Sequence, residues 1–336
     1  MPNFFLFGSF FLCLFLSLSS SVYASTVNID NSGEANAAFI NLKSDDTSLS
    51  LSTGQKSGHI TYQIGGTYTD GVAIYVRPFP TSELAFPLNI NVSEIRYSFR
   101  LNPKLIASLS HQWGISQYAG KMEDSDWGIA PFSNDPNSLD IFSKSDSQLN
   151  FNQTSLHIKN RPSKKRNYQF ITQWNMQLGL LIDVENYDYS ASNLVQYYPS
   201  TGLEPVTDAR EVITYDVLKM ASYLTASFTT PRKNRFTASI DLGFSPLMYI
   251  SDHDNHILRD KTSIGKTYGW SLYKKTQLAW NVSERTHVFI NWSSEFSKSN
   301  GWQTQYFTPT GDKLFEIRIK HISQQNDIQI GFKIDI

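Results

Sequence analysis

The 336-residue sequence contains a single cysteine, Cys13, which lies in the first apolar stretch of the chain. Leu12 stands before it, where a lipoprotein signal needs a small residue, so we expect no lipid anchor at this position. The rest of the chain has no cysteine and therefore forms no disulfide, although its N-terminus predicts export. This excludes a small disulfide-stapled secreted domain and favours a bacterial envelope protein.

Charge and long apolar runs are also scarce. Charged residues make up 18% of the chain and the formal net charge is -1, so no overall field attracts nucleic acid. After the N-terminal stretch, no segment approaches the roughly 20 apolar residues that a membrane helix needs. Internal repeats and long low-complexity linkers are absent from the sequence too, so we expect one domain.

The N-terminal run "FFLFGSFFLCLFLSL" predicts a signal peptide. It is followed by Val22, Tyr23 and Ala24, which fit the small-x-small rule of signal peptidase, so residues 1–24 are the expected signal. An uncleaved membrane anchor is the alternative. The domain then covers residues 25–336, and residues 25–48 are expected to include a loose N-terminus.

Apolar and polar residues alternate with a period of two through much of the remaining chain, and this pattern is typical of β-strands. It is found in "NYQFITQWNMQLGLL", "RFTASIDLGFS", "THVFINWSSEF" and the C-terminal "DIQIGFKIDI". An all-β fold follows. It is either a water-soluble β-sandwich or a transmembrane antiparallel β-barrel, because both place apolar and polar side chains on opposite faces.

Three features favour the barrel. The alternating segments run to roughly 9–13 residues, which is the length needed to cross a bilayer at a tilt. Their polar faces carry Gln, Asn, Ser, Thr and Gly, as in a wet lumen. Short turns such as "NVSERT" alternate with long polar stretches such as "FSNDPNSLDIFSKSDS". The terminal Ile336 departs from the aromatic residue that usually ends such barrels.

Two acidic stretches are candidates for chemistry. In "GKMEDSDWG", Asp124 and Asp126 are two residues apart, so their carboxylates share one face of a strand. If the pleat of "KLIASLSHQWGI" continues unbroken, both point to the interior. Two close carboxylates raise the pKa of one of them, which suits a pair that holds a water or a proton. A solvated loop is the alternative.

In "SDHDNHILRD", Asp254 and His256 are also two residues apart. A carboxylate beside an imidazole orients it and stabilises its charged form, as a general base requires. His253 lies on the opposite face and is a rival, and a metal site of His253, His256 and an aspartate also stays open. Even-numbered residues of the preceding strand face lipid, so the pleat must slip once, and Pro246 is the expected place.

These stretches resemble the Asp-x-Asp-Trp and Asp-x-Asp-x-His stretches of the omptin family. The segments "SDSQLNFNQTSLHIK", "YQFITQWNMQLGLLIDVENYDYSA" and "VITYDVLKMASYLTASF" resemble strands of that family in the same order, so the resemblance covers roughly residues 93–336. It implies an aspartic-type outer-membrane endopeptidase of a Gram-negative bacterium. The implied fold is a ten-stranded barrel that extends above the outer membrane, with its active site facing the exterior.

By this resemblance the catalytic residues are Asp124, Asp126, Asp254 and His256. His256 and Asp124 would hold the attacking water, Asp254 would orient His256, and Asp126 would polarise the site. Asp252 matches a pocket acid that favours cleavage near basic residues of polypeptides outside the cell. The resemblance implies no metal and no other cofactor at the site, and no nucleic-acid partner.

The chain also departs from the family pattern. The second pocket acid of the family lies on the first strand, where Gly58 of "TGQKSGHITY" stands, although Asp70 could substitute for it. A weaker preference for basic residues is therefore expected. The segment "YVRPFPTSELAFPLNI" is interpreted as an insertion in an outer hairpin.

The resemblance further implies contact with outer-membrane lipid and a requirement for lipopolysaccharide. Glu185, Tyr187 and Lys266 are the candidate lipopolysaccharide-binding residues, and Arg259 is a further one. Two other functions stay open. The barrel could be an adhesin or invasin with little proteolysis, or a small porin whose acids set cation preference.

Overall fold

The computed structural model describes residues 27–29, 35–37, 47–69, 71–129, 135–160, 175–230 and 235–336. The chain divides into two compact units, Met1–Lys43 and Ser44–Ile336. In the first unit, β1 (Val27–Ile29) pairs with β2 (Ala35–Ala37). The predicted signal peptide and Asp70 lie outside the described residues. Within those residues, no helix combines the length and the apolarity needed to span a membrane.

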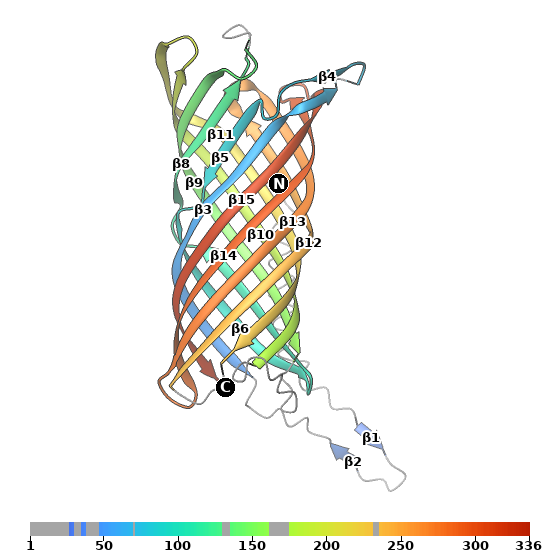
Figure 1. Cartoon of the computed structure of the whole chain (residues 1–336), viewed down its shortest axis with the longest axis vertical. Coiled ribbons are helices and arrows are strands. Elements are labelled where there is room, and N and C mark those ends of the chain that lie inside the picture. The colour runs from blue at the N-terminus through green and yellow to red at the C-terminus, as the bar shows by residue number, and fades with distance from the viewer. Residues whose placement is uncertain are drawn as a thin grey trace. The chain divides into compact units, whose positions relative to one another are not determined.

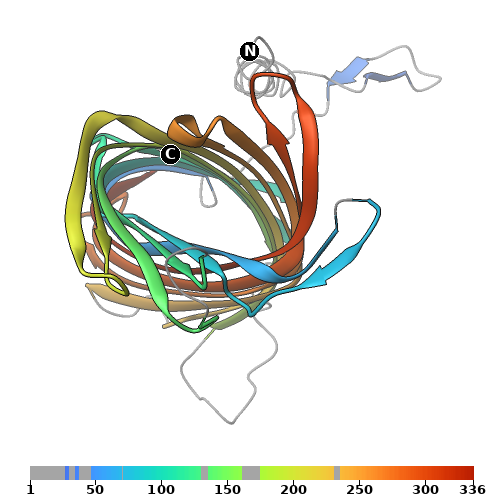
Figure 2. The same ribbon diagram turned by 90° about the horizontal axis from the view of Figure 1, so that it is seen from above.

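The second unit is a closed antiparallel β-barrel with ten strand positions around its ring, as predicted (Figures 1 and 2). Its elements are β3 (Ser48–Thr69), β4 (Ile74–Val76), β5 (Ser82–Pro87), β6 (Ile90–Asn102), β7 (Leu105–Gly114), β8 (Tyr118–Trp127), β9 (Leu139–Asn160), β10 (Asn175–Tyr198), β11 (Leu203–Thr229), β12 (Phe236–His256), the 3-10 helix η2 (Ile257–Arg259), β13 (Lys261–Asn281), β14 (Thr286–Phe307) and β15 (Asp312–Asp335).

Two of the ten positions are each shared by two shorter strands. β5 pairs with the part of β3 nearer its C-terminal end, and β6 pairs with the part that begins at Ser48. β7 and β8 both pair with β9. The pairing of β15 with β3 closes the ring, so the wall has no free edge along these strands.

The interpretation of "YVRPFPTSELAFPLNI" as an insertion in an outer hairpin is wrong for its central part. β5 lies within the wall, where it pairs with β3 on one side and with β8 on the other. Leu84 and Phe86 of β5 are buried in the interior. The prolines in and before this segment suggest a loop, but its six residues form a strand that ends at Pro87 and buries two large apolar side chains.

An apolar belt lies on the outer face of β10 to β15, towards the end of the barrel that carries the C-terminus. Figure 1 shows that end of the barrel. Its outward-facing side chains are Leu178, Leu180, Ile182, Leu224, Leu242, Phe244, Leu272, Leu278, Trp280, Val288, Ile290, Trp292, Phe296, Ile328, Ile330, Phe332 and Ile334. Crossing a bilayer takes only about 9–11 residues of a tilted strand. Strands β9 to β15 have 21 to 27 residues, so the barrel continues well beyond the membrane.

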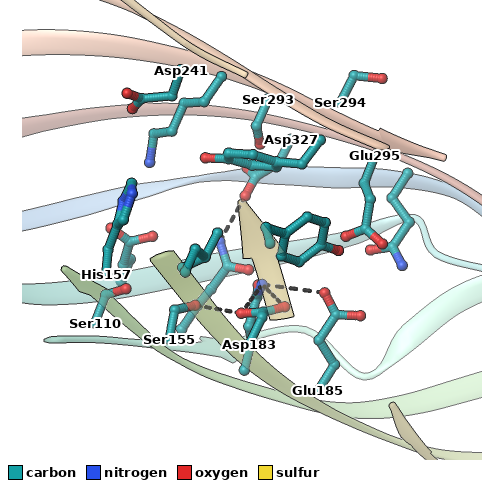
Figure 3. Close-up of a pocket in the computed structure, with 18 of the residues that line it drawn as sticks. Ser110, Ser155, His157, Asp183, Glu185, Asp241, Ser293, Ser294, Glu295 and Asp327 are labelled. Atoms are coloured by element: carbon teal, nitrogen blue, oxygen red, sulfur yellow. Dashed lines mark hydrogen bonds between the residues drawn. The ribbon is translucent and has the colours of Figure 1, made fainter. Parts of the chain in front are cut away.

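Inside the belt the barrel is polar, and several of its charged side chains are paired or hydrogen-bonded (Figure 3). The side chains there line a cavity of about 80 Å³. Asp183 accepts hydrogen bonds from Ser155 at 2.5 Å and from Gln153 at 3.0 Å. Lys159 Nζ lies 2.9 Å from Asp241 Oδ1. This is the polar interior that the alternating strands predict.

One bulge in β12 exchanges the two faces of that strand. The pairing of β12 with β13 slips between Ser245 and Met248, and Pro246 lies in this bulge. Phe244, before the bulge, faces outward, whereas Met248 and Ile250 beyond it are buried in the interior. The predicted slip near Pro246 is confirmed. It turns the even-numbered residues at the far end of β12 inward.

A layer of buried aromatic rings fills the interior beyond the polar cavity. The Phe86 ring stacks on Tyr215 with 4.5 Å between centroids, and it lies 4.9 Å from Tyr189. Tyr62 lies 5.6 Å from Tyr215. Because these four rings come from β3, β5, β10 and β11, they join four strands across the interior.

The apolar belt predicts where a charged side chain lowers the free energy of unfolding. Replacing Ile330, which is 59% exposed near the middle of the belt on β15, by Arg should lower the free energy of unfolding by about 2–4 kcal/mol. The matched control is Ile264→Arg on β13, outside the belt and 43% exposed, which should cost less than about 1 kcal/mol. Guanidinium titrations in phospholipid vesicles measure both. Equal costs for the two substitutions would contradict this placement of the membrane.

Candidate active site

Asp254 and His256 lie together at the outer end of β12, and both are buried in the interior. His256 Nε2 lies 2.9 Å from Asp254 Oδ2. When the imidazole is neutral and carries its proton on Nε2, this contact leaves Nδ1 as an acceptor. The pair can therefore act as an oriented base.

Asp124 and Asp126 come from β8 and are also buried. β5 holds β8 in register, with Leu84 opposite Asp124 and Ser82 opposite Asp126. The condition of an unbroken pleat is not met, because β7 ends at residue 114, β8 begins at residue 118, and the register shifts between residues 118 and 120. The two carboxylates nevertheless point inward.

The two halves of the site interact through their charges. Burial, the neighbouring Asp126 and then Asp254 raise the pKa of Asp124 to about 8, while Arg259 acts in the opposite direction. Because Asp254 contributes, the acids of β8 and β12 lie within electrostatic reach of each other. They form one site, although 128 residues separate Asp126 from Asp254 in sequence.

Arg259 of η2 brings a positive charge to the site, where the sequence had suggested a role on the outer wall. Its Nη2 lies 3.4 Å from Asp126 Oδ2. Burial lowers the pKa of Arg259, but Asp124 and Asp126 together raise it above its ordinary value. Arg259 therefore stays charged beside the two aspartates.

Asp252 lies two residues before Asp254 and faces the same interior, but its carboxylate is enclosed. The side chain has 0% exposure, and His321 Nε2 of β15 lies 3.0 Å from Asp252 Oδ2. The same Nε2 is hydrogen-bonded to the Tyr215 hydroxyl at 2.9 Å. A Cβ at Gly265 would come within 2.6 Å of both carboxylate oxygens, so only glycine leaves room for Asp252.

Gly58 supplies no acid to this site, as the sequence predicts, and it pairs with Gln325 of β15 rather than with His321. Its φ is +130°, and a Cβ there would lie 2.0 Å from the backbone oxygen of Gln324, so no side chain fits. The residue of β3 that lies near Asp252 is Tyr62, whose ring centroid is 5.5 Å from that of His321. Sequence reasoning missed Tyr62 and His321 because no local pattern links residues from distant strands.

His253 faces away from the site. Its side chain is 51% exposed and lies 3.7 Å from Asp216 Oδ2 on the outer wall. It therefore cannot share a metal with His256, which points into the interior. In the part of the chain that the structure describes, the carboxylates close enough to hold a metal are those of Asp183, Glu185 and Glu295 in the lumen, where Lys219 already pairs with Glu185 at 3.0 Å.

The assignment of Glu185 and Tyr187 to lipopolysaccharide binding is wrong. Both residues have 0% exposure and face the interior, where the Tyr187 hydroxyl donates a hydrogen bond to Glu185. A lipid on the outer wall cannot reach them. Lys266, in contrast, is exposed on the outer face of β13.

A family model and one solved structure agree with this fold. The family model "Omptin family" matches residues 82–335. The outer membrane protease OmpT from Escherichia coli has a similar structure, with a TM-score of 0.71 and 17% identity over 88% of this chain and 99% of OmpT. OprG from Pseudomonas aeruginosa gives a TM-score of 0.38 and 8% identity over 87% and 98% of the two chains. The translocator domain of NalP from Neisseria meningitidis gives 0.35 and 8% over 88% and 90%. No curated protein matches.

The two neighbouring carboxyl groups predict that Asp124 keeps its proton at neutral pH. Since the folded pKa of Asp124 is about 8 and its ordinary value is 3.8, the folded state binds this proton more tightly, and stability falls as the pH rises from about 4 to about 8. In the infrared difference spectrum of wild type minus Asp124→Asn, a protonated-carboxyl band should be present at neutral pH and disappear near pH 8. Arg259→Gln should move the loss to higher pH, because Arg259 lowers this pKa. Loss of the band below pH 6 would contradict the assignment.

Proposed function

Because this chain belongs to the omptin family and is thus an outer-membrane protease of a Gram-negative bacterium, we propose that it hydrolyses peptide bonds with a water activated between β8 and β12. The observation that carries this proposal is the buried contact of 2.9 Å between His256 and Asp254, within electrostatic reach of a second buried aspartate pair. Neither half alone would supply both an oriented base and a second group to hold the water.

In the proposed reaction, Nδ1 of neutral His256 takes a proton from water as the water oxygen attacks the peptide carbonyl carbon. Asp254 keeps the imidazole in the required tautomer and stabilises the imidazolium that forms. Asp124 Oδ1 is buried and has no hydrogen-bond partner among the described residues, so it is placed to accept a hydrogen bond from the same water.

The remaining groups stabilise the charge that develops. Because Asp124 keeps its proton at neutral pH, it can donate a hydrogen bond to the peptide oxygen as that oxygen becomes negative. Arg259 adds a positive charge beside Asp126. The imidazolium then gives its proton to the leaving amine. In this aspartic-type mechanism, water attacks directly and no covalent enzyme intermediate forms.

The two rival functions have less support. A porin needs an open lumen, whereas the rings of Tyr62, Phe86, Tyr189 and Tyr215 are buried and packed against one another across the interior. An adhesin needs no buried base. Keeping an aspartate–histidine contact beside two further buried acids is costly unless the groups have a use.

We also propose that lipopolysaccharide binds the outer wall and is required for activity. Lys266, Trp302 and Arg318 occupy paired positions on β13, β14 and β15, and all three are exposed. Arg318 Cζ lies 5.0 Å from the centre of the Trp302 ring. Cations beside an exposed aromatic ring suit the phosphates and sugars of such a lipid.

Catalysis is tested by substitution. His256→Ala and Asp254→Asn should each reduce kcat by at least ~10²-fold, the usual scale for a general-base contribution. His253→Ala is the matched control, since it removes the neighbouring imidazole on the outer face, and it should change kcat little. Digestion of a peptide library in the presence of lipopolysaccharide, followed by mass spectrometry, measures all three. An essential His253 with a dispensable His256 would rule out this site.

Lipid activation is tested on the outer wall. Lys266→Ala and Arg318→Ala should each raise the lipopolysaccharide concentration for half-maximal activity by roughly tenfold, the scale of one lost charge-assisted hydrogen bond. Lys313→Ala, which removes an exposed charge elsewhere on β15, should leave it unchanged. Full activity of the wild-type protein in lipopolysaccharide-free detergent would contradict the requirement.

A further inference from the structure

The acid beside the catalytic pair, Asp252, is closed off from substrate. Asp252 is the acid nearest in sequence to Asp254, and its carboxylate would attract a basic substrate side chain if that side chain could reach it. It has no exposed surface, and His321 Nε2 stands 3.0 Å from its Oδ2. The chain's own imidazole thus occupies the position that a substrate cation would take.

His321 is held in this position on several sides. Its Nε2 is hydrogen-bonded to the Tyr215 hydroxyl at 2.9 Å, and its Nδ1 lies 3.3 Å from the Thr267 hydroxyl. The Tyr62 ring lies 5.5 Å from the imidazole, with an angle of 35° between the ring planes. His321 itself is only 1% exposed. A substrate side chain would have to displace a packed and hydrogen-bonded residue in order to reach Asp252.

The other acids of the site also have a basic partner from the same chain. Arg259 lies beside Asp126, and His256 lies beside Asp254. Lys261 follows η2, and its charge interacts with Asp254, Asp126 and Asp124. A lysine or arginine of the substrate would therefore meet acids that already have partners, and the repulsion of two cations, Arg259 and Lys261.

We propose that His321 is a specificity-determining residue, which closes Asp252 to basic side chains of the substrate, so that this acid gives no preference for Lys or Arg at the scissile position. The proposal rests on the proposed peptidase function and replaces the preference for basic residues that Asp252 alone predicts.

The first test uses matched peptides that differ only in Arg or Phe at the scissile position. The wild-type protein should cleave the two peptides with similar kcat/KM, and Asp252→Asn should change the Arg-to-Phe ratio by less than about twofold. His321→Ala should raise that ratio by about tenfold or more, the scale of one charge-assisted hydrogen bond. The double variant His321→Ala/Asp252→Asn should lose this gain.

A second measurement does not depend on catalysis. Benzamidine, a soluble guanidinium-like cation, should show no saturable binding to the wild-type protein by calorimetry. It should bind His321→Ala and lose that binding in the double variant. A boiling-dependent shift in electrophoretic mobility establishes that each variant is folded. If His321→Ala does not fold, the wild-type and Asp252→Asn proteins still decide the question, through the cleavage ratio and through benzamidine binding.

The outcomes separate the two proposals. A wild-type preference for Arg that Asp252→Asn abolishes, or Asp252-dependent benzamidine binding by the wild-type protein, would overturn the role of His321 and leave the peptidase function intact. Failure of every folded protein to cleave any peptide would overturn the proposed function. The benzamidine titrations would still show whether His321 closes Asp252.

Discussion

The period of two along a β-strand is the constraint on which this molecule depends, since it assigns every side chain of the wall either to lipid or to the interior. On β12, an unbroken period would place Asp252, Asp254 and His256 on the same outer face as Phe244. The bulge at residues 245–248 exchanges the faces within a few residues. One strand therefore presents apolar residues to the membrane at one end and an acidic, basic site to the interior at the other.

Buried charge is the second constraint, and the chain meets it with its own residues. The lumen inside the apolar belt pairs Lys159 with Asp241 and Lys219 with Glu185. At the site, Arg259 lies beside Asp126, and His321 lies beside Asp252. At Asp124, burial and the acidic neighbours instead leave the carboxyl protonated at neutral pH. This proton lies where the proposed mechanism needs a group that can both give and accept hydrogen bonds.

Much of this arrangement could be predicted from the sequence, because alternation and spacing are local. The barrel, the slip near Pro246 and the inward direction of Asp254 and His256 all follow from the period of two, whereas the break between β7 and β8 means that the direction of Asp124 and Asp126 does not. The same rule, applied along β10, places Glu185 and Tyr187 inside, since Leu178 and Leu180 face lipid and no bulge lies between. The pairing of β5 and the contact between His321 and Asp252 could not be predicted, because they join segments that are distant in sequence.

The aromatic layer connects these constraints to function. Tyr215 packs against Phe86 on its ring face and bonds His321 through its hydroxyl, so one side chain belongs both to the apolar packing and to the polar site. If Tyr215 lost its contact with Phe86 or with His321, its other contact would weaken too, because a buried tyrosine needs both its packing and a partner for its hydroxyl. The packing of the aromatic layer and the closure of Asp252 are therefore coupled. A change that opened the acidic residue to substrate would also loosen the layer that separates the site from the lumen.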